Sequence, residues 1–203
     1  MTTPRQAAVT FTAIGLLFLA YPLIRPYDDE TTMAGALSFA GDSWIAAHMA
    51  AVIGFILLPM ALTALSPSRA AQLMTYLGVG LTLPYYGAEV FGLHAIGEQI
   101  KQDGDLSLLA MVDTIRYNPA AMTIFALGLV LIAAGTTTAA IRHTSTLPGW
   151  TAAPFALGFV LFIPQFFTPA PFRIAHGFLI AAGSAWLAVE LWRNQTLTPA
   201  SAR

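Results

Sequence analysis

The chain has 203 residues, of which 57% are hydrophobic and only 9% are charged, and its net charge at pH 7 is −1. A soluble domain carries about 25% charged residues, so this composition excludes an ordinary water-covered surface and indicates a membrane protein. The near-neutral charge argues against nucleic acid as a partner. Because there is no cysteine, disulfides, thiolate metal sites and a cysteine nucleophile are excluded.

Long apolar windows follow one another along the chain. A helix needs about 20 apolar residues to cross the hydrocarbon of a bilayer, and the candidate windows are residues 7–25, 44–65, 70–97, 119–141, 150–168 and 172–192. The first window follows Arg5 as in a signal peptide, but no small-residue cleavage site comes after it, so we expect a retained helix. The sequence predicts an all-α polytopic membrane protein, a bundle of six transmembrane helices in a single domain, residues 1–203.

Two features interrupt this pattern. The third and fifth predicted helices contain Pro84 and Pro164, which deprive a carbonyl of its usual donor and invite a kink. The longest polar segment, 98–118, holds apolar residues that predict a short interfacial helix. Both kinds of interruption are expected toward the outer face.

The orientation follows from lysine and arginine in the short loops. The basic residues that fall on the N-terminal side of the bundle are Arg5, Arg69, Arg142, Arg193 and Arg203. Almost no acidic residue accompanies them, whereas the basic residues of the other side lie among acids. The sequence therefore predicts a multi-pass protein of the cell membrane with both termini in the cytoplasm.

A weak internal repeat links the two proline-containing helices. Residues 77–84 (LGVGLTLP) and 157–164 (LGFVLFIP) share the pattern L-G-x-x-L-x-x-P, and each is followed by an aromatic pair and a histidine. Interrupted helices at matching positions are typical of binding sites in membrane folds. The alternative is chance similarity between two apolar helices.

Nearly all polar residues of the predicted helices fall in one leaflet, the outer one. Ionisable side chains are costly at membrane depth and usually face a protein interior. The pattern predicts a polar pocket open to the outer face and closed toward the cytoplasm by Ala- and Gly-rich half-helices, with His48, Glu89 and His176 in one cavity. The residues predicted to bind a substrate there are Trp44, His48, Tyr85, Tyr86, Phe91, His94, Phe162, Gln165, Phe166, Arg173 and His176.

Glu89 is the most unusual of these residues, because it lies well inside its predicted helix. At 100° per residue it shares a stripe with Tyr85 and Tyr86, while His94 lies on the opposite face. A dry environment would keep its carboxyl protonated and make it a general acid. An arginine beside it would keep it ionised instead. The carboxyls predicted to supply a proton are Glu89, Asp42 and Asp28.

Simpler roles exist for several of these side chains. Trp44 and Tyr27 are typical aromatic anchors at the membrane interface, and a lone membrane histidine often forms only a helix-to-helix hydrogen bond. Arg25 and Lys101 are expected to contact lipid head groups.

Acids combined with aromatic faces suit proton-initiated isoprenoid chemistry, because aromatic rings stabilise a carbocation. In length, helix number and this acid-plus-aromatic character, the chain resembles the bacterial, actinobacterial integral-membrane terpene cyclases that make drimane-type indole terpenoids. The resemblance covers the whole chain in outline, and no family residue is carried over. It implies an enzyme, a lyase or isomerase, that cyclises or isomerises a lipophilic substrate within the bilayer, and no cofactor is expected.

Two other functions remain open. His48, His94 and His176 are expected at a similar depth in the membrane and suit a metal ion or haem. No two of them, however, are three or four residues apart on one helix. A chain of this size also suits a solute-binding subunit of a membrane transporter. A nucleotide-driven pump is excluded because no P-loop motif occurs, and the sequence gives no oligomeric state.

Overall fold

The computed structural model of the chain describes residues 3–143, 147 and 150–196, and all regular structure in these residues is helical. The predicted all-α fold is confirmed. The helices are α1 (Pro4–Ile24), α2 (Met33–Ala40), α3 (Asp42–Leu65), α4 (Arg69–Gly87), the π-helical segment η1 (Ala88–Gly92), α5 (Leu93–Asp103), the 3₁₀ segment η2 (Leu106–Leu109), α6 (Ala110–Arg116), α7 (Pro119–Ile141), α8 (Ala153–Val160), α9 (Phe162–Gln165) and α10 (Ala170–Thr196).

The prediction of six membrane-spanning helices is wrong in number. Among the described residues, four helices are long and apolar enough to cross a membrane, namely α1, α3, α7 and α10. The window at 70–97 fails because it is divided among α4, η1 and α5 and because α4 carries Gln72, two threonines and three tyrosines. The window at 150–168 fails because it forms two short helices, of 8 and 4 residues, which break at Leu161 just before Pro164.

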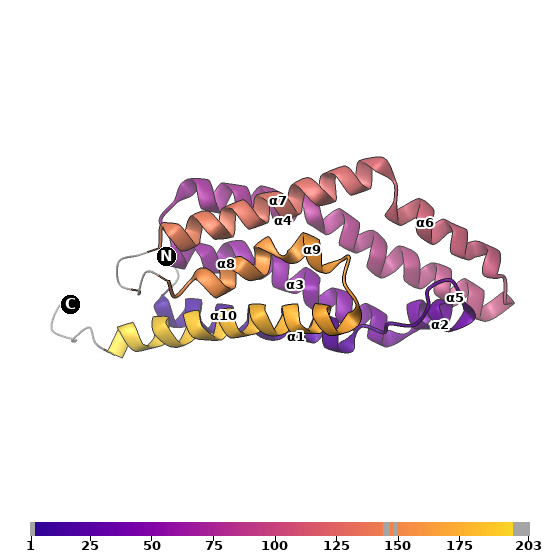
Figure 1. Cartoon of the computed structure of the whole chain (residues 1–203), viewed down its shortest axis with the longest axis horizontal. Coiled ribbons are helices and arrows are strands. Elements are labelled where there is room, and N and C mark those ends of the chain that lie inside the picture. Colours follow the sequence, from indigo (N-terminus) through magenta and orange to yellow (C-terminus); the bar gives the residue numbers. More distant parts are fainter. Residues whose placement is uncertain (1–2, 144–146, 148–149, 197–203) are drawn as a thin grey trace.

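The four long apolar helices nevertheless run side by side with α4, α8 and α9 along the long axis of the molecule. Figure 1 shows α4 with α7, α1 with α10, and α8 followed by α9 between these pairs. Helix α3 packs against α1 and α4. We call this part the bundle. Helix α1 begins and α10 ends at the same end of the bundle, near Arg5 and Arg193. Arg203, on which the predicted orientation also depends, lies outside the described residues.

Helix α4 stays in the bundle because small residues bring it close to α7. A Cβ atom added to Gly128 would lie 2.5 Å from Thr82 Oγ1 and 2.7 Å from the carbonyl oxygen of Gly78. Small residues of this kind allow helix backbones to approach closely. The hydroxyls of Thr75 and Thr82 donate to carbonyls of their own helix, so the interface leaves neither of them unsatisfied.

Aromatic side chains fill the centre of the bundle. Phe18 contacts Phe55 and Phe159 edge to face, with ring centroids 4.9 and 5.4 Å apart, and Phe162 lies 5.2 Å from Phe55. Edge-to-face pairs of this kind add to the free energy gained from burial alone. These rings come from α1, α3, α8 and α9 and so join four helices.

At the opposite end, α2, α5, η2 and α6 form a second, smaller layer that we call the cap (Figure 1). Its core contains Phe39 and Trp44, with apolar side chains from α5 and α6. Gly97 allows α5 to touch α2, because a Cβ there would lie 2.6 Å from the Ala40 nitrogen. The interfacial helix predicted within 98–118 corresponds to the end of α5 followed by η2 and α6.

Between α4 and α5 the chain forms one π-helical segment. Helix α4 continues past Pro84 to Gly87, and in η1 the Leu93 N–H donates to the Ala88 carbonyl, five residues back. Such π-helical turns are rare and are frequent at functional sites. Here the turn carries Glu89, and the Glu89 carbonyl accepts a hydrogen bond of 2.9 Å from the Trp44 indole.

Candidate functional site

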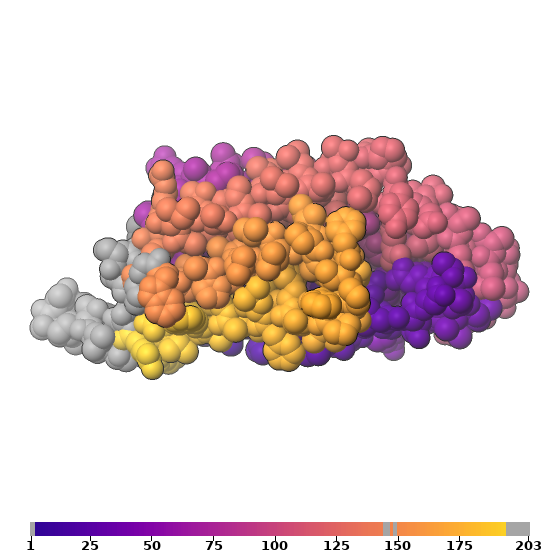
Figure 2. All heavy atoms as spheres, viewed as in Figure 1, coloured from indigo at the N-terminus to yellow at the C-terminus, as the bar shows by residue number. Residues whose placement is uncertain are grey.

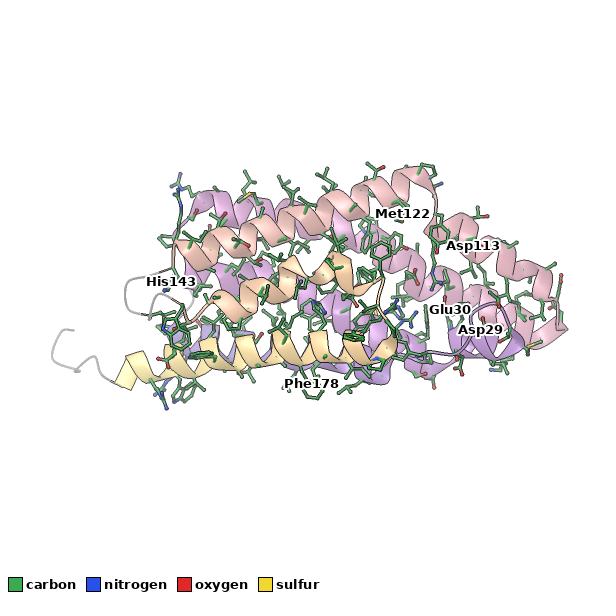
Figure 3. All side chains as sticks on the ribbon, viewed as in Figure 1. Asp29, Glu30, Asp113, Met122, His143 and Phe178 are labelled. Carbon is green, nitrogen blue, oxygen red and sulfur yellow. The ribbon has the colours of Figure 1, made fainter. Side chains whose placement is uncertain are left out.

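One cavity of about 650 Å³ opens where the bundle meets the cap. Its polar end is lined by Arg25, Glu30, His48, Glu89 and Arg116, and its apolar end by Met122, Phe125, Leu129, Ile163 and Phe166. Figure 3 places Glu30 and Met122, one from each end of the cavity, beside the cap and away from His143. Figure 2 shows this region as a recess between the orange residues of α9 and the pink residues of α6.

Four charged side chains form a continuous network at the polar end. The Arg116 guanidinium donates to both carboxylate oxygens of Glu89, at 2.7 and 3.0 Å. Its third nitrogen donates to Glu30, which also accepts from Arg25 at 2.7 Å. The side chains of Arg116 and Glu89 are only 15% and 11% exposed. Two cations and two anions therefore neutralise one another in a mostly buried place.

Glu30 and Arg116 lie outside the four apolar helices, and both are held in their charged forms. Burial acts to raise the pKa of the Glu30 carboxyl, but the hydrogen bonds and charges of Arg116 and Arg25 outweigh it, and the pKa lies below its usual range. Burial acts to lower the pKa of Arg116, but hydrogen bonds and charge from Glu89 and Glu30 raise it. The same guanidinium donates to both oxygens of Glu89, which is the geometry of a bidentate arginine–carboxylate pair.

His48 presents a hydrogen-bond acceptor to the cavity. Its Nδ1 lies 2.8 Å from the Trp44 carbonyl oxygen. A carbonyl can only accept, so in the neutral ring Nδ1 carries the proton and Nε2 keeps its lone pair. The ring is 2% exposed and is fixed against the Trp44 indole, with centroids 4.1 Å apart. His48 lines the cavity, and its Nε2 makes no hydrogen bond with any described residue.

Tyr86 lines the same cavity, and its hydroxyl is buried. The residue is 2% exposed, and its hydroxyl makes no hydrogen bond of normal geometry with any described residue. The Tyr21 phenol is its polar neighbour, with ring centroids 6.1 Å apart. Tyr85 lines the cavity too and stacks on Phe125 at 4.1 Å. A buried polar group without a partner costs free energy, so it invites a ligand or water.

Arg173 reaches the cavity from the first turn of α10. It donates to the carbonyl oxygens of Thr168 at 3.0 Å and Phe166 at 2.6 Å. Within the described residues, no carboxylate lies within 4.0 Å of its guanidinium. Arg173 thus carries a fixed positive charge at the cavity wall.

The remaining substrate-binding candidates divide between two places. Gln165, His176 and Phe162 line a second space of about 10 Å³ beside Arg173, which is room for about one water molecule. His176 donates from Nε2 to the Gly158 carbonyl at 2.7 Å. The structure thus brings His48 and Glu89 into the main cavity and places His176 next to it.

Several residues singled out from the sequence lie elsewhere. Phe91 is 61% exposed, and His94 bonds the Phe39 carbonyl at 2.9 Å inside the cap. Trp44 is buried behind His48 and contacts the cavity only through it. Asp42 is an exposed residue in the first turn of α3, outside the cavity. Asp28 lies on the cavity rim and accepts a hydrogen bond from Ser38.

Sequence reasoning missed the two cations that matter most to Glu89. Arg25 was expected to contact lipid head groups, but it pairs with Glu30 and lies 5.1 Å above the Trp44 and Tyr27 rings. No contact with Glu89 was predicted for Arg116, which lies in the polar segment 98–118. The available signal was Glu89 itself, because a buried carboxylate needs a cation, but four outer basic residues were possible partners.

The histidines do not gather around a common point. His48, His94 and His176 each bond a different backbone carbonyl. Within the described residues, no group of three or more His, Cys, Asp or Glu side chains is arranged to hold a metal ion. The donor set therefore does not favour the metal or haem alternative.

No family model matches the chain, and no curated protein or solved structure matches it either. The geometry of the cavity is therefore the basis for assigning a function.

Proposed function

We propose that the protein is an integral-membrane enzyme that takes a lipophilic, isoprenoid-like molecule into the cavity and isomerises it by proton transfer. The observation that carries this proposal is a single cavity with a buried polar end and an aromatic, apolar end. Its volume of about 650 Å³ falls within the range of about 300–1,000 Å³ that is usual for small-molecule sites.

The apolar rim of the cavity supports access from lipid. Met122 is 37% exposed and Phe167 is 85% exposed, and they lie on the rim with Ala126 and Ile163. In a soluble protein such a rim would be a liability. In a bilayer it forms a lateral entrance between α7 and α9 for a molecule already dissolved in the membrane.

Proton transfer by His48 fits the geometry better than cyclisation initiated by Glu89. Cyclisation needs a neutral acid, whereas Arg116 holds Glu89 as a carboxylate and Asp42 lies outside the cavity. In the isomerisation, His48 Nε2 takes a proton from a saturated carbon next to a carbonyl group, or next to a double bond conjugated with that carbonyl, and returns it at another carbon as the double bond moves. The Tyr86 hydroxyl donates to the carbonyl oxygen while that oxygen carries the charge.

Filling the cavity tests whether it binds the molecule. Ala126 and Leu127 are exposed neighbours on α7, but only Ala126 lines the cavity. We expect Ala126→Trp to reduce the lipophilic compound that copurifies per protein molecule by at least about tenfold, equivalent to about 1.4 kcal/mol of binding free energy. Mass spectrometry of an organic extract measures it, and Leu127→Trp should retain the wild-type amount. Equal retention by the two variants contradicts the proposal.

We also propose that both termini face the cytoplasm. Arg5, Arg69, Arg142 and Arg193 begin or end helices at the end of the bundle away from the cavity, where positive charge is typical of the cytoplasmic side. Reporter fusions at residue 67 and at the C-terminus should both give cytoplasmic signals. A periplasmic signal from either fusion rejects this orientation.

A further inference from the structure

The arginines around the cavity differ in whether a carboxylate is paired with them. Arg25 and Arg116 are paired with Glu30 and Glu89. Arg173 lines the same cavity with only backbone carbonyls as partners. The one other carboxylate on the lining is that of Asp28, which lies exposed on the rim beyond salt-bridge distance and accepts a hydrogen bond from Ser38. The protein thus leaves one cation of the cavity wall without an anion.

The first residues of α10 add to this positive character. Thr168, Pro169 and Ala170 line the cavity, so the N-terminal end of a 27-residue helix faces it. No acidic residue occupies the first turn of α10, and the Thr168 hydroxyl donates backward to Gln165. The N-terminal end of a helix carries partial positive charge, which favours a bound anion. The backbone N–H groups add little here, because Pro169 and Pro171 have none and those of Phe172 and Arg173 donate to the Pro169 carbonyl.

An independent observation also indicates a missing ligand group. Tyr86 lines the cavity, and its hydroxyl is buried beside the Tyr21 phenol without a hydrogen bond of normal geometry within the described residues. Arg173 is able to donate hydrogen bonds to oxygen atoms, and the α10 terminus adds partial positive charge beside it. Together they are complementary to a head group rich in negatively charged oxygen.

We propose that the isoprenoid-like ligand carries an oxyanion head group, a phosphate or a carboxylate, which Arg173 and the N-terminal end of α10 bind. The tail of the ligand lies along Phe125, Leu129 and Phe166. This inference rests on the proposed function, because it presumes that the cavity takes a lipophilic molecule. It adds the chemical class of the head group and the residue that selects it.

Two ligands with the same tail test the head group. Protein purified in a maltoside detergent is titrated with farnesyl phosphate and with farnesol, and the dissociation constants are measured by calorimetry. We expect farnesyl phosphate to bind at least about tenfold more tightly, the scale of a charge-assisted hydrogen bond. Arg173→Gln should remove this preference and leave farnesol binding within about twofold, which also shows that the variant is folded.

Control variants and a third ligand complete the experiment. Arg173→Lys should keep part of the preference because it keeps the charge, and Arg69→Gln, at the opposite end of the bundle, should keep all of it. Equal binding of both ligands, unaffected by Arg173→Gln, overturns the oxyanion head group but leaves the lipophilic cavity intact. Failure of both ligands to bind overturns the proposed function. Inorganic phosphate binding as tightly as farnesyl phosphate overturns the amphiphilic ligand and indicates a free anion.

Discussion

Replacing Arg116 with glutamine is expected to lower the free energy of unfolding by about 3 kcal/mol, within the usual cost of breaking a buried ion pair. The guanidinium joins Glu89 of the bundle to Glu30 of the loop that leads into the cap, with 15% of the Arg116 side chain exposed. Without it, two carboxylates face each other in a mostly buried place with only Arg25 left to compensate. Unfolding in mixed detergent micelles, followed by circular dichroism, measures the loss.

Two comparisons show whether the loss comes from the stranded carboxylates. The double variant Arg116→Gln, Glu89→Gln should recover a substantial part of the stability, because it removes one of the uncompensated charges. Lys101→Gln is the matched control, since Lys101 is 54% exposed and pairs only with Glu98 on the same helix. An exposed pair contributes at most about 1 kcal/mol. If Arg116→Gln costs no more than Lys101→Gln, the network is not a structural element.

The apolar helices were predictable from the sequence because local rules determine them. Helix α7 occupies the predicted window 119–141, with Asn118 capping its N–H groups and Pro119 in its first turn. Helix α3 differs from its window by two residues at its start. The two windows that failed contain polar residues or a break before Pro164, which a window average conceals.

The side of the molecule that carries the site was also predictable, but the partners within it were not. Gathering of polar residues at one end of the helices follows from the cost of burying them in lipid. The ion pair between Arg116 and Glu89 joins residues that are 27 positions apart in the sequence, so it forms only when the cap folds. That folding depends on contacts such as Gly97 against α2, which have no local sequence signature.

The helical stripe drawn through Tyr85, Tyr86 and Glu89 assumes a uniform 100° per residue. The wide turn of η1 changes that spacing after Gly87. Glu89 still faces the cavity with Tyr86, and His94 still faces away from it, into the cap. Glu89 still shares the cavity face with Tyr86 because the π-helical turn begins at Ala88, directly before Glu89, which is the last residue of the stripe.

The second large effect is expected at His48 rather than at Glu89. From the sequence alone, Glu89→Gln is predicted to lower activity by at least about 10²-fold, the scale of a general acid. In the structure, Arg116 already holds Glu89 as a carboxylate, so removing its acidity changes little. His48, by contrast, offers a free Nε2 to the cavity. We therefore expect His48→Gln to lower proton transfer by about 10²-fold, and Glu89→Gln by less than about tenfold per folded molecule.

Deuterium uptake measures this difference directly. Farnesal, an aldehyde with an isoprenoid tail, is incubated with each variant in D₂O, and mass spectrometry follows the deuterium that enters next to the conjugated carbonyl system. Glutamine at position 48 can still donate to the Trp44 carbonyl, so that variant keeps the fold and loses only the basic nitrogen. Full exchange by His48→Gln combined with a 10²-fold loss in Glu89→Gln would return the chemistry to the carboxyl. In that case the Arg116 pair must open during turnover, and acid-initiated cyclisation becomes the better proposal for the reaction.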